Sequence, residues 1–172
     1  MPSVLFVCTA NICRSPMASA LFQGQIAQRP DAKRWRVASA GVWAMDGSPA
    51  ARYTQAVVEK RGFDLSSHRA QGVSRELLRR YDLILTMERG HKEALQAEFP
   101  GLANRIYVIT EMVDCRGDIA DPMGGAVIDY EDTARELEGI LTLGMEKIIS
   151  LAAERQSTDS GDQRNGEQSR AD

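Results

Sequence analysis

The stretch from Val4 to Ala18, VLFVCTANICRSPMA, decides the fold and indicates the chemistry. It opens with an apolar run that ends at Val7, a pattern typical of a short strand buried in a parallel sheet. Pro16 suits the first turn of a helix, where its missing N–H breaks no hydrogen bond. The residues from Cys8 to Ser15 are therefore expected to connect a strand to a helix.

The same alternation continues along the chain. Apolar runs predict further buried strands at 36–41, 83–85 and 106–109, and helical spacing predicts helices after Pro16, over 51–61, from Ser74, over 91–99 and, unbroken, over 130–152. Strands that alternate with helices imply a parallel sheet covered on both faces. We therefore predict an α/β fold, one domain with a four-stranded parallel sheet and helices on both faces. Such sheets bind ligands beyond the carboxyl ends of their strands, where Cys8 is expected to lie.

Composition and charge exclude several classes of protein. The 172 residues suffice for one domain with a sizeable core, and the net charge of −3 argues against nucleic acid or an anionic membrane as partner. No apolar run approaches the length of a membrane span, and the N-terminus is typical of a strand rather than a signal peptide. We therefore expect a cytoplasmic protein.

The number of cysteines and the composition of the C-terminal segment indicate whether the protein has disulfides, a metal site or a disordered tail. Three cysteines do not make a disulfide framework, and no His, Cys and carboxylate cluster suggests a metal, so we expect neither metal nor cofactor. From Glu154 to Asp172 the chain has no large apolar residue. Such a segment cannot bury enough surface to offset its ordering entropy. We predict a folded domain over 1–153 and a disordered polar tail over 154–172.

The loop from Cys8 to Ser15 has the form C-x5-R-S, which suits phosphate chemistry. Its backbone N–H groups can converge on one tetrahedral anion, helped by the positive end of the following helix. The same field stabilises a thiolate at Cys8, the form of cysteine that acts as a nucleophile. Arg14 can bind two phosphate oxygens side by side, and Ser15 can donate a hydrogen bond to the sulfur. The predicted phosphate-binding residues are Thr9, Ala10, Asn11, Ile12, Cys13, Arg14 and Ser15.

The stretch Val7 to Ala18, VCTANICRSPMA, closely resembles the signature of low-molecular-weight protein-tyrosine phosphatases, and the resemblance covers about Ser3 to Ala153. It implies a Rossmann-like, phosphatase I-like fold and metal-independent hydrolysis of phosphotyrosine through a cysteinyl-phosphate intermediate. The family's late Asp-Pro is matched by Asp121-Pro122, which implies that Asp121 is the general acid. The expected catalytic residues are thus Cys8, Arg14 and Asp121.

Further roles follow from the same resemblance. The side chains expected to support the phosphate loop are Asn11, Ser15, Ser39 and His68, and those expected to contact the substrate are Ile12, Trp43 and Met123. Many relatives have Tyr at the position of Met123, and relatives specialised for phosphoarginine tend to have Thr at that of Ile12, so Ile12 favours an aryl phosphate. The implied partner is a phosphotyrosine-containing protein, and a bacterial tyrosine kinase is a common partner of bacterial relatives.

Alternatives remain for one residue and for the function. Cys13 could form a reversible disulfide with Cys8 that protects it from over-oxidation, or it could be a structural thiol under the loop. An arsenate reductase on the same scaffold would need a relay of extra cysteines, whereas this chain has only Cys115 beyond the loop. A non-catalytic phosphate-binding regulatory module is the other alternative, and it would need neither the Cys8 thiol nor the Asp121 carboxyl.

Overall fold

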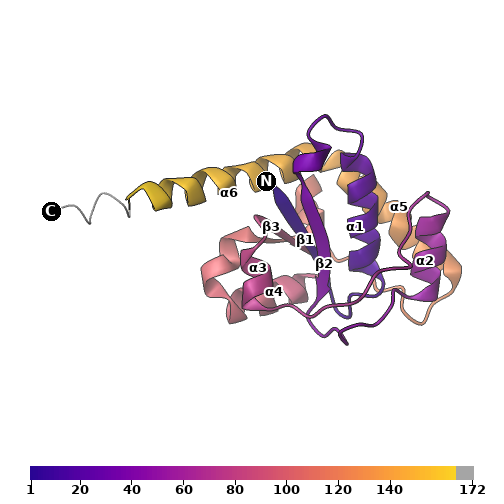
Figure 1. Ribbon diagram of the computed structural model, residues 1–172. Helices are drawn as coiled ribbons and strands as arrows, with labels where there is room; N and C mark the ends of the chain where they lie inside the picture. The colour runs from indigo at the N-terminus through magenta and orange to yellow at the C-terminus, as the bar shows by residue number, and fades with distance from the viewer. Residues whose placement is uncertain (166–172) are drawn as a thin grey trace.

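The structure is a computed structural model that describes residues 1–165, with side chains described as far as Arg155. Its centre is one parallel sheet with the strand order β2-β1-β3-β4 (Figure 1). The predicted fold class and the four parallel strands are confirmed. The strands are β1 (Ser3–Cys8), β2 (Arg36–Gly41), β3 (Leu83–Thr86) and β4 (Ile106–Val108).

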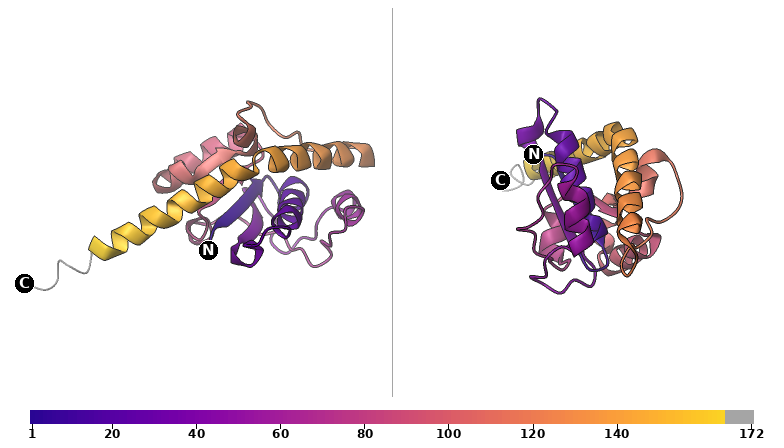
Figure 2. Two further views of the ribbon diagram at one scale, coloured as in Figure 1. Left: turned by 90° about the horizontal axis from the view of Figure 1, so that it is seen from above. Right: turned by 90° about the vertical axis from the view of Figure 1, so that its right-hand side faces the viewer.

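Helices cover both faces of this sheet, as the alternation of strands and helices predicted (Figures 1 and 2). One face packs against α1, α5 and α6, and the other against α3 and α4. The helices are α1 (Arg14–Ile26), α2 (Arg52–Glu59), α3 (Arg75–Arg79), α4 (Arg89–Glu98), α5 (Val127–Leu143) and α6 (Met145–Asn165). Three 3-10 turns complete the elements: η1 (Ala32–Arg34), η2 (Pro100–Arg105) and η3 (Ile109–Val113).

Strand β1 lies between β2 and β3 and contributes to both cores. Val4 and Phe6 point into the core under α1 and α5, while Leu5 and Val7 point into the core under α3 and α4. This follows from the period of two residues in a strand. A strand buried on both faces needs a continuous apolar run, which is the pattern seen in the sequence.

One predicted helix was wrong, because the helix expected over 130–152 is two helices that meet at Gly144. The chain comes close to η3 there, and a Cβ added at Gly144 would lie 2.8 Å from Cβ of Met112. A glycine after the last helical residue is a common helix end because it has no side chain to clash. Apolar spacing continues on both sides of Gly144, which is why periodicity alone did not reveal the break.

The last helix extends beyond the expected end of the folded domain. Helix α6 runs through Glu154 to Asn165 and projects from the body of the molecule (Figures 1 and 2). Disorder of the tail stays a prediction, and residues 166–172 lie outside the described part of the chain. Within the described residues, no helix is both long and apolar enough to cross a membrane.

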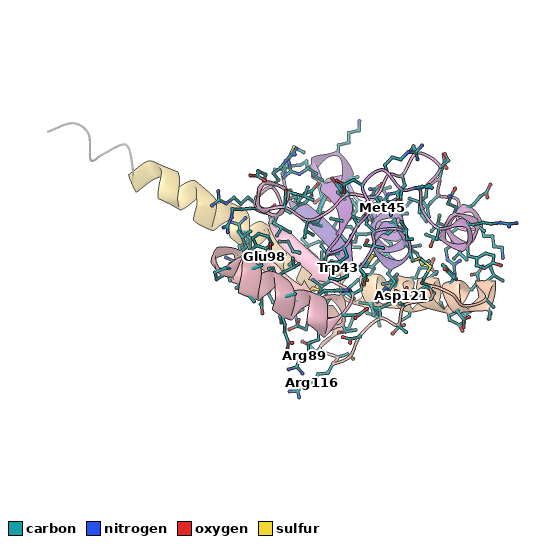
Figure 3. All side chains as sticks on the ribbon, turned by 90° about the horizontal axis from the view of Figure 1, so that it is seen from below. Trp43, Met45, Arg89, Glu98, Arg116 and Asp121 are labelled. Carbon is teal, nitrogen blue, oxygen red and sulfur yellow. The ribbon has the colours of Figure 1, made fainter. Side chains whose placement is uncertain are left out.

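The carboxyl ends of the central strands bring distant residues to one edge of the sheet. Cys8 ends β1 and lies opposite Gly41 at the end of β2, while Val7 lies opposite Thr86 at the end of β3. Figure 3 views this edge, with Trp43 and Asp121 on loops around it. The predicted site residues therefore come from segments far apart in the sequence.

Candidate active site

The loop from Cys8 to Ser15 is organised around the side chain of Asn11, which is completely buried. Its Nδ2 donates to Oγ of Ser15 at 2.9 Å and to Oγ of Ser39 at 2.8 Å, and its Oδ1 accepts from the backbone nitrogen of Gln71 at 3.0 Å. Nε2 of His68 donates to the carbonyl oxygen of Asn11 at 2.8 Å. All four residues predicted to support the loop therefore belong to one hydrogen-bonded network.

Asn11 also has an unusual backbone. Its φ is 57°, in the left-handed region that is uncommon for residues other than glycine. Asparagine tolerates this region better than most residues, and its buried hydrogen bonds stabilise the conformation. The left-handed residue turns the chain sharply, so that the loop curls back towards its own first residue.

The backbone carbonyls of the loop point away from its interior. The carbonyl oxygen of Thr9 accepts from the Trp43 nitrogen at 2.8 Å, that of Asn11 accepts from His68, and that of Ile12 accepts from the Ala51 nitrogen at 2.8 Å. In a trans peptide the following N–H points opposite to the C=O. The N–H groups after these three carbonyls therefore point into the loop, which makes a concave site for an anion.

Cys8 and Ser15 lie at the base of this loop and are both buried. Sγ of Cys8 is 3.0 Å from Oγ of Ser15, which is also 3.2 Å from the carbonyl oxygen of Ala40. Since Asn11 Nδ2 donates to the same hydroxyl, the Ser15 proton is free to point either to the Ala40 oxygen or to the sulfur. This arrangement can stabilise negative charge on the sulfur.

The guanidinium of Arg14 lies beside the loop and is only 1% exposed. Its Nη1 donates to Glu88 and, at 2.8 Å, to the carbonyl oxygen of Ile119. Its Nη2 is 3.2 Å from Oδ2 of Asp121 and 3.3 Å from Oγ1 of Thr9. Its Nε is buried and has no hydrogen-bond partner among the described residues. A buried donor without a partner is costly, so this atom suits an anion that enters the loop.

The carboxyl of Asp121 completes the set and is partly exposed. It lies on the loop between η3 and α5, and its Oδ1 accepts from the backbone nitrogen of Met123 at 3.1 Å. Pro122 follows it and is buried, which limits the backbone freedom of Asp121. The structure therefore brings the thiol and the guanidinium of one loop together with a carboxyl from a segment more than a hundred residues later.

Comparison with known proteins agrees with this geometry. The family described as "Low molecular weight phosphotyrosine protein phosphatase" matches residues 3–156. The chain belongs to this family. A protein-arginine-phosphatase of Geobacillus stearothermophilus is 36% identical over 84% of this chain and 95% of the relative, and a probable low molecular weight protein-tyrosine-phosphatase, EpsP, of Ralstonia nicotianae is 35% identical over 87% of this chain and 97% of the relative.

A solved structure supports the same assignment. The low molecular weight protein tyrosine phosphatase from T. tengcongensis is 41% identical, with a TM-score of 0.79 over 86% of this chain and 99% of the other. The family resemblance of the sequence is thus confirmed, and with it the assignment to phosphatases that need no metal. Among the described residues, no group of three His, Cys, Asp or Glu side chains is placed to hold a metal ion.

In this phosphatase Cys13 points away from the anion site. The thiol is buried and donates towards the Tyr130 hydroxyl on α5 at 3.8 Å. Burial raises the pKa of the Cys13 thiol above its usual value, although the hydroxyls of Tyr130 and Thr54 lower it in part. Burial also raises the pKa of Tyr130, to about 12. Both groups are thus held in their neutral forms. The disulfide with Cys8 stays a prediction, and both thiols are free here.

The three residues predicted to contact the substrate differ in their exposure. Ile12 is half-buried and packs against the core, Trp43 is 85% exposed, and Met123 is 49% exposed. Hydrogen bonding of the Trp43 nitrogen to Thr9 connects the Trp43 segment to the loop. Contact of these three side chains with a substrate stays a prediction.

Sequence reasoning missed three residues that contact the loop. Glu88 binds Arg14, His91 contacts the Thr9 hydroxyl at 2.9 Å, and Gln71 holds Asn11. Glu88 and His91 follow β3 closely, and parallel neighbours of β1 end at the same edge, so the topology was a usable signal. Gln71 lies in a segment without helical or strand periodicity, and the sequence offered no signal for it.

Proposed function

We propose that this phosphatase hydrolyses phosphotyrosine in proteins, with Cys8 as nucleophile, Arg14 as the phosphate-binding cation and Asp121 as general acid. The observation that best supports this is the buried Arg14 guanidinium. Its Nε has no partner among the described residues and lies beside a loop whose N–H groups point inward. A phosphoryl group offers acceptor oxygens to these donors, which can stabilise the charge of the transition state. The loop residues Thr9 to Ser15 would line this site.

In the first step, the Cys8 thiolate attacks phosphorus and forms a sulfur–phosphorus bond. The bond from phosphorus to the tyrosine oxygen breaks, and the Asp121 carboxyl gives its proton to that oxygen. Asp121 is 3.2 Å from Nη2 of Arg14 in the structure, so it would leave this nitrogen free for a phosphate oxygen as it turns to the leaving group.

In the second step, water attacks phosphorus and the sulfur–phosphorus bond breaks. The Asp121 carboxylate takes the proton from this water, and the bonding electrons return to the Cys8 sulfur. Ser15 lies 3.0 Å from that sulfur and can donate to it as it leaves. The cycle therefore ends with the thiolate and the protonated carboxyl with which it began.

Substrate choice depends on the entrance to the loop. Ile12 and the exposed Trp43 and Met123 offer apolar contacts to an aromatic ring, which favours phosphotyrosine. Phosphoarginine is the second candidate, because two of the relatives that match this chain are protein-arginine phosphatases. Relatives specialised for phosphoarginine tend to have Thr in place of Ile12, and this difference supports phosphotyrosine as the first choice.

Hydrolysis of p-nitrophenyl phosphate with a chelator and a reductant would test the chemistry. We expect turnover by the wild type, none by Cys8→Ser, and a fall in kcat of about a hundredfold or more for Asp121→Ala, the scale of general acid catalysis. Thr110→Ser, at a buried position away from the loop, is the matched control and should stay active. A wild type that binds vanadate but never turns over would support the regulatory module instead.

Peptides would test the substrate. The wild type should prefer a phosphotyrosine peptide to the same peptide with phosphoarginine, and Ile12→Thr should shift the ratio of the two kcat/KM values towards phosphoarginine. A wild type that prefers phosphoarginine would exclude the first choice while leaving the thiolate mechanism intact. We further propose a bacterial tyrosine kinase as the partner, a cytoplasmic location and a catalytic domain over 1–153.

A further inference from the structure

His91 is a buried titratable residue that the mechanism above does not use. It lies in the first turn of α4 and is 7% exposed. Its Nε2 is 2.9 Å from Oγ1 of Thr9, and its Nδ1 is buried without a hydrogen-bond partner among the described residues. Space filling alone does not need an imidazole here, since a leucine would fill a similar volume without an unpaired nitrogen. Among the described residues, the contact with Thr9 is thus the hydrogen bond that the imidazole makes.

The Thr9 hydroxyl connects His91 to Arg14. Oγ1 of Thr9 accepts from Nη2 of Arg14 at 3.3 Å while it contacts Nε2 of His91 on its other side. A hydroxyl has one proton and two acceptor lone pairs, so it can serve both neighbours at once. A continuous path of hydrogen bonds therefore leads from α4 through the phosphate loop to the guanidinium.

The charges around His91 favour its neutral form. Burial lowers the pKa of the imidazole, and the Arg14 guanidinium lowers it further, while the carboxylates of Glu88, Asp118 and Asp121 oppose this only in part. Oε1 of Glu88 lies 3.9 Å from Nε2 and is engaged by Arg14. Nε2 of a neutral imidazole can accept a hydrogen bond from the Thr9 hydroxyl, whose oxygen can then accept one from Arg14.

We propose that His91 is a positioning residue, which holds the Arg14 guanidinium in its phosphate-binding orientation through the Thr9 hydroxyl. Glu88 and the Ile119 carbonyl hold Nη1, whereas Nη2 contacts only Asp121 and Thr9 among the described residues. When Asp121 turns to the leaving group, Thr9 is the remaining contact of Nη2. A guanidinium held at both ends keeps its Nε and Nη2 directed at the phosphate oxygens.

This inference rests on the proposed function, since it needs Arg14 to bind phosphate. The test compares Thr9→Ser, Thr9→Val, His91→Leu and the Thr9→Val/His91→Leu double variant. Thr9→Ser keeps the hydroxyl, so it should lose less of its kcat/KM than Thr9→Val does. Thr9→Val and His91→Leu should each lower kcat/KM about tenfold and weaken vanadate inhibition to a similar extent. Thr9→Val removes the hydrogen bond to the charged Arg14, and His91→Leu removes the contact that orients the hydroxyl making that bond.

The double variant separates positioning from a merely structural role. If His91 acts through Thr9, the double variant should also lose about tenfold, because the second change removes nothing that the first has left. A loss of about a hundredfold in the double variant, the product of two independent tenfold losses, would overturn the proposal. Full activity of His91→Leu or of Thr9→Val would overturn it as well.

A spectroscopic measurement tests the hydrogen bond without turnover. The chain has two histidines, His68 and His91, so the NMR spectrum of the imidazole rings is simple to assign with one variant. Thr9→Val should change the ring nitrogen shifts of His91 and leave those of His68 unchanged. Unchanged His91 shifts would overturn the inference even in an active enzyme. Changed shifts in a protein that binds vanadate but does not hydrolyse phosphate would support the hydrogen bond while the proposed function fails.

Discussion

Gly41 lies directly beneath Asn11, and no larger residue fits there. A Cβ added at Gly41 would lie 2.8 Å from the backbone nitrogen of Asn11 and 2.6 Å from the carbonyl oxygen of Thr9. Both neighbours are backbone atoms of the phosphate loop, which cannot turn aside as a flexible side chain could. The end of β2 thus determines how closely the loop can pack against the sheet.

Gly41→Ala should therefore impair catalysis more than folding. The methyl group would push the loop by a fraction of an ångström to one ångström, and a misplacement of about 1 Å at a reacting group can cost about a hundredfold in rate. We expect kcat/KM for p-nitrophenyl phosphate to fall by about that factor. Gly139→Ala, in α5 with open space around it, is the control and should keep full activity. Full activity of Gly41→Ala would contradict the tight packing.

Asn11 combines a strained backbone with three hydrogen bonds of its side chain, and two substitutions separate these contributions. Asn11→Ala loses the bonds and keeps a side chain in the left-handed region, so we expect unfolding in urea to become easier by about 3 kcal/mol. Asn11→Gly loses the same bonds but relieves the strain, and should be more stable than the alanine variant by about 1 kcal/mol. Equal stability of the two variants would show that the left-handed backbone stores no strain.

The loop could be predicted from sequence because its features have local physical causes. An apolar run makes a buried strand, a proline suits a helix start, and cysteine and arginine at this spacing suit an oxyanion. The support network of Asn11 with Ser39 and His68 came from family resemblance, since no local rule joins residues so far apart in the chain. The structure shows that these residues are joined by hydrogen bonds, which the resemblance alone did not establish.

Two misses have a common physical reason, which is that they depend on a distant segment. The helix over 130–152 breaks at Gly144 because the chain there packs against Met112, although a glycine inside a helix costs only about 1 kcal/mol and periodicity continues past it. The ion pair of Arg14 with Glu88 likewise exists because β3 lies beside β1. A single sequence predicts that the strands exist, but it does not determine their order in the sheet.

Tyr130 should make the stability of the protein fall at high pH. Its pKa is raised to about 12 from an ordinary value of 10.0, because burial disfavours the phenolate. A group whose pKa is raised on folding stabilises the folded state fully below its unfolded pKa and loses this contribution as pH rises towards the folded pKa. Between pH 9 and 11 the wild type should therefore lose about 1 kcal/mol from this group.

Chemical unfolding at pH 9 and pH 11 would measure this loss against Tyr130→Phe, which cannot titrate. Tyr53→Phe is the control, since Tyr53 packs edge-to-face on Tyr130 with ring centroids 5.4 Å apart but is 41% exposed. The Cys13 thiol, whose pKa burial also raises, contributes in the same direction and is kept in all three proteins, because it also raises the pKa of Tyr130. An equal loss with and without the Tyr130 hydroxyl would contradict this account.

The neutral Cys13 thiol leads to a prediction about oxidation. Peroxide oxidises the Cys8 thiolate to a sulfenic acid and is itself reduced to water, with its second oxygen leaving as hydroxide that takes up a proton from solvent. The Cys13 thiol can then attack the sulfenic sulfur, which expels water and leaves a disulfide. Without Cys13 the sulfenic acid is oxidised further, to acids that a thiol reductant does not reverse. In a Cys115→Ser background, which removes the exposed thiol, dithiothreitol should restore most activity to a peroxide-treated enzyme with Cys13 and little to Cys13→Ser. Tyr130→Phe should recover as the parent does. Equal recovery with and without Cys13 would mean that Cys13 is a structural thiol under the loop.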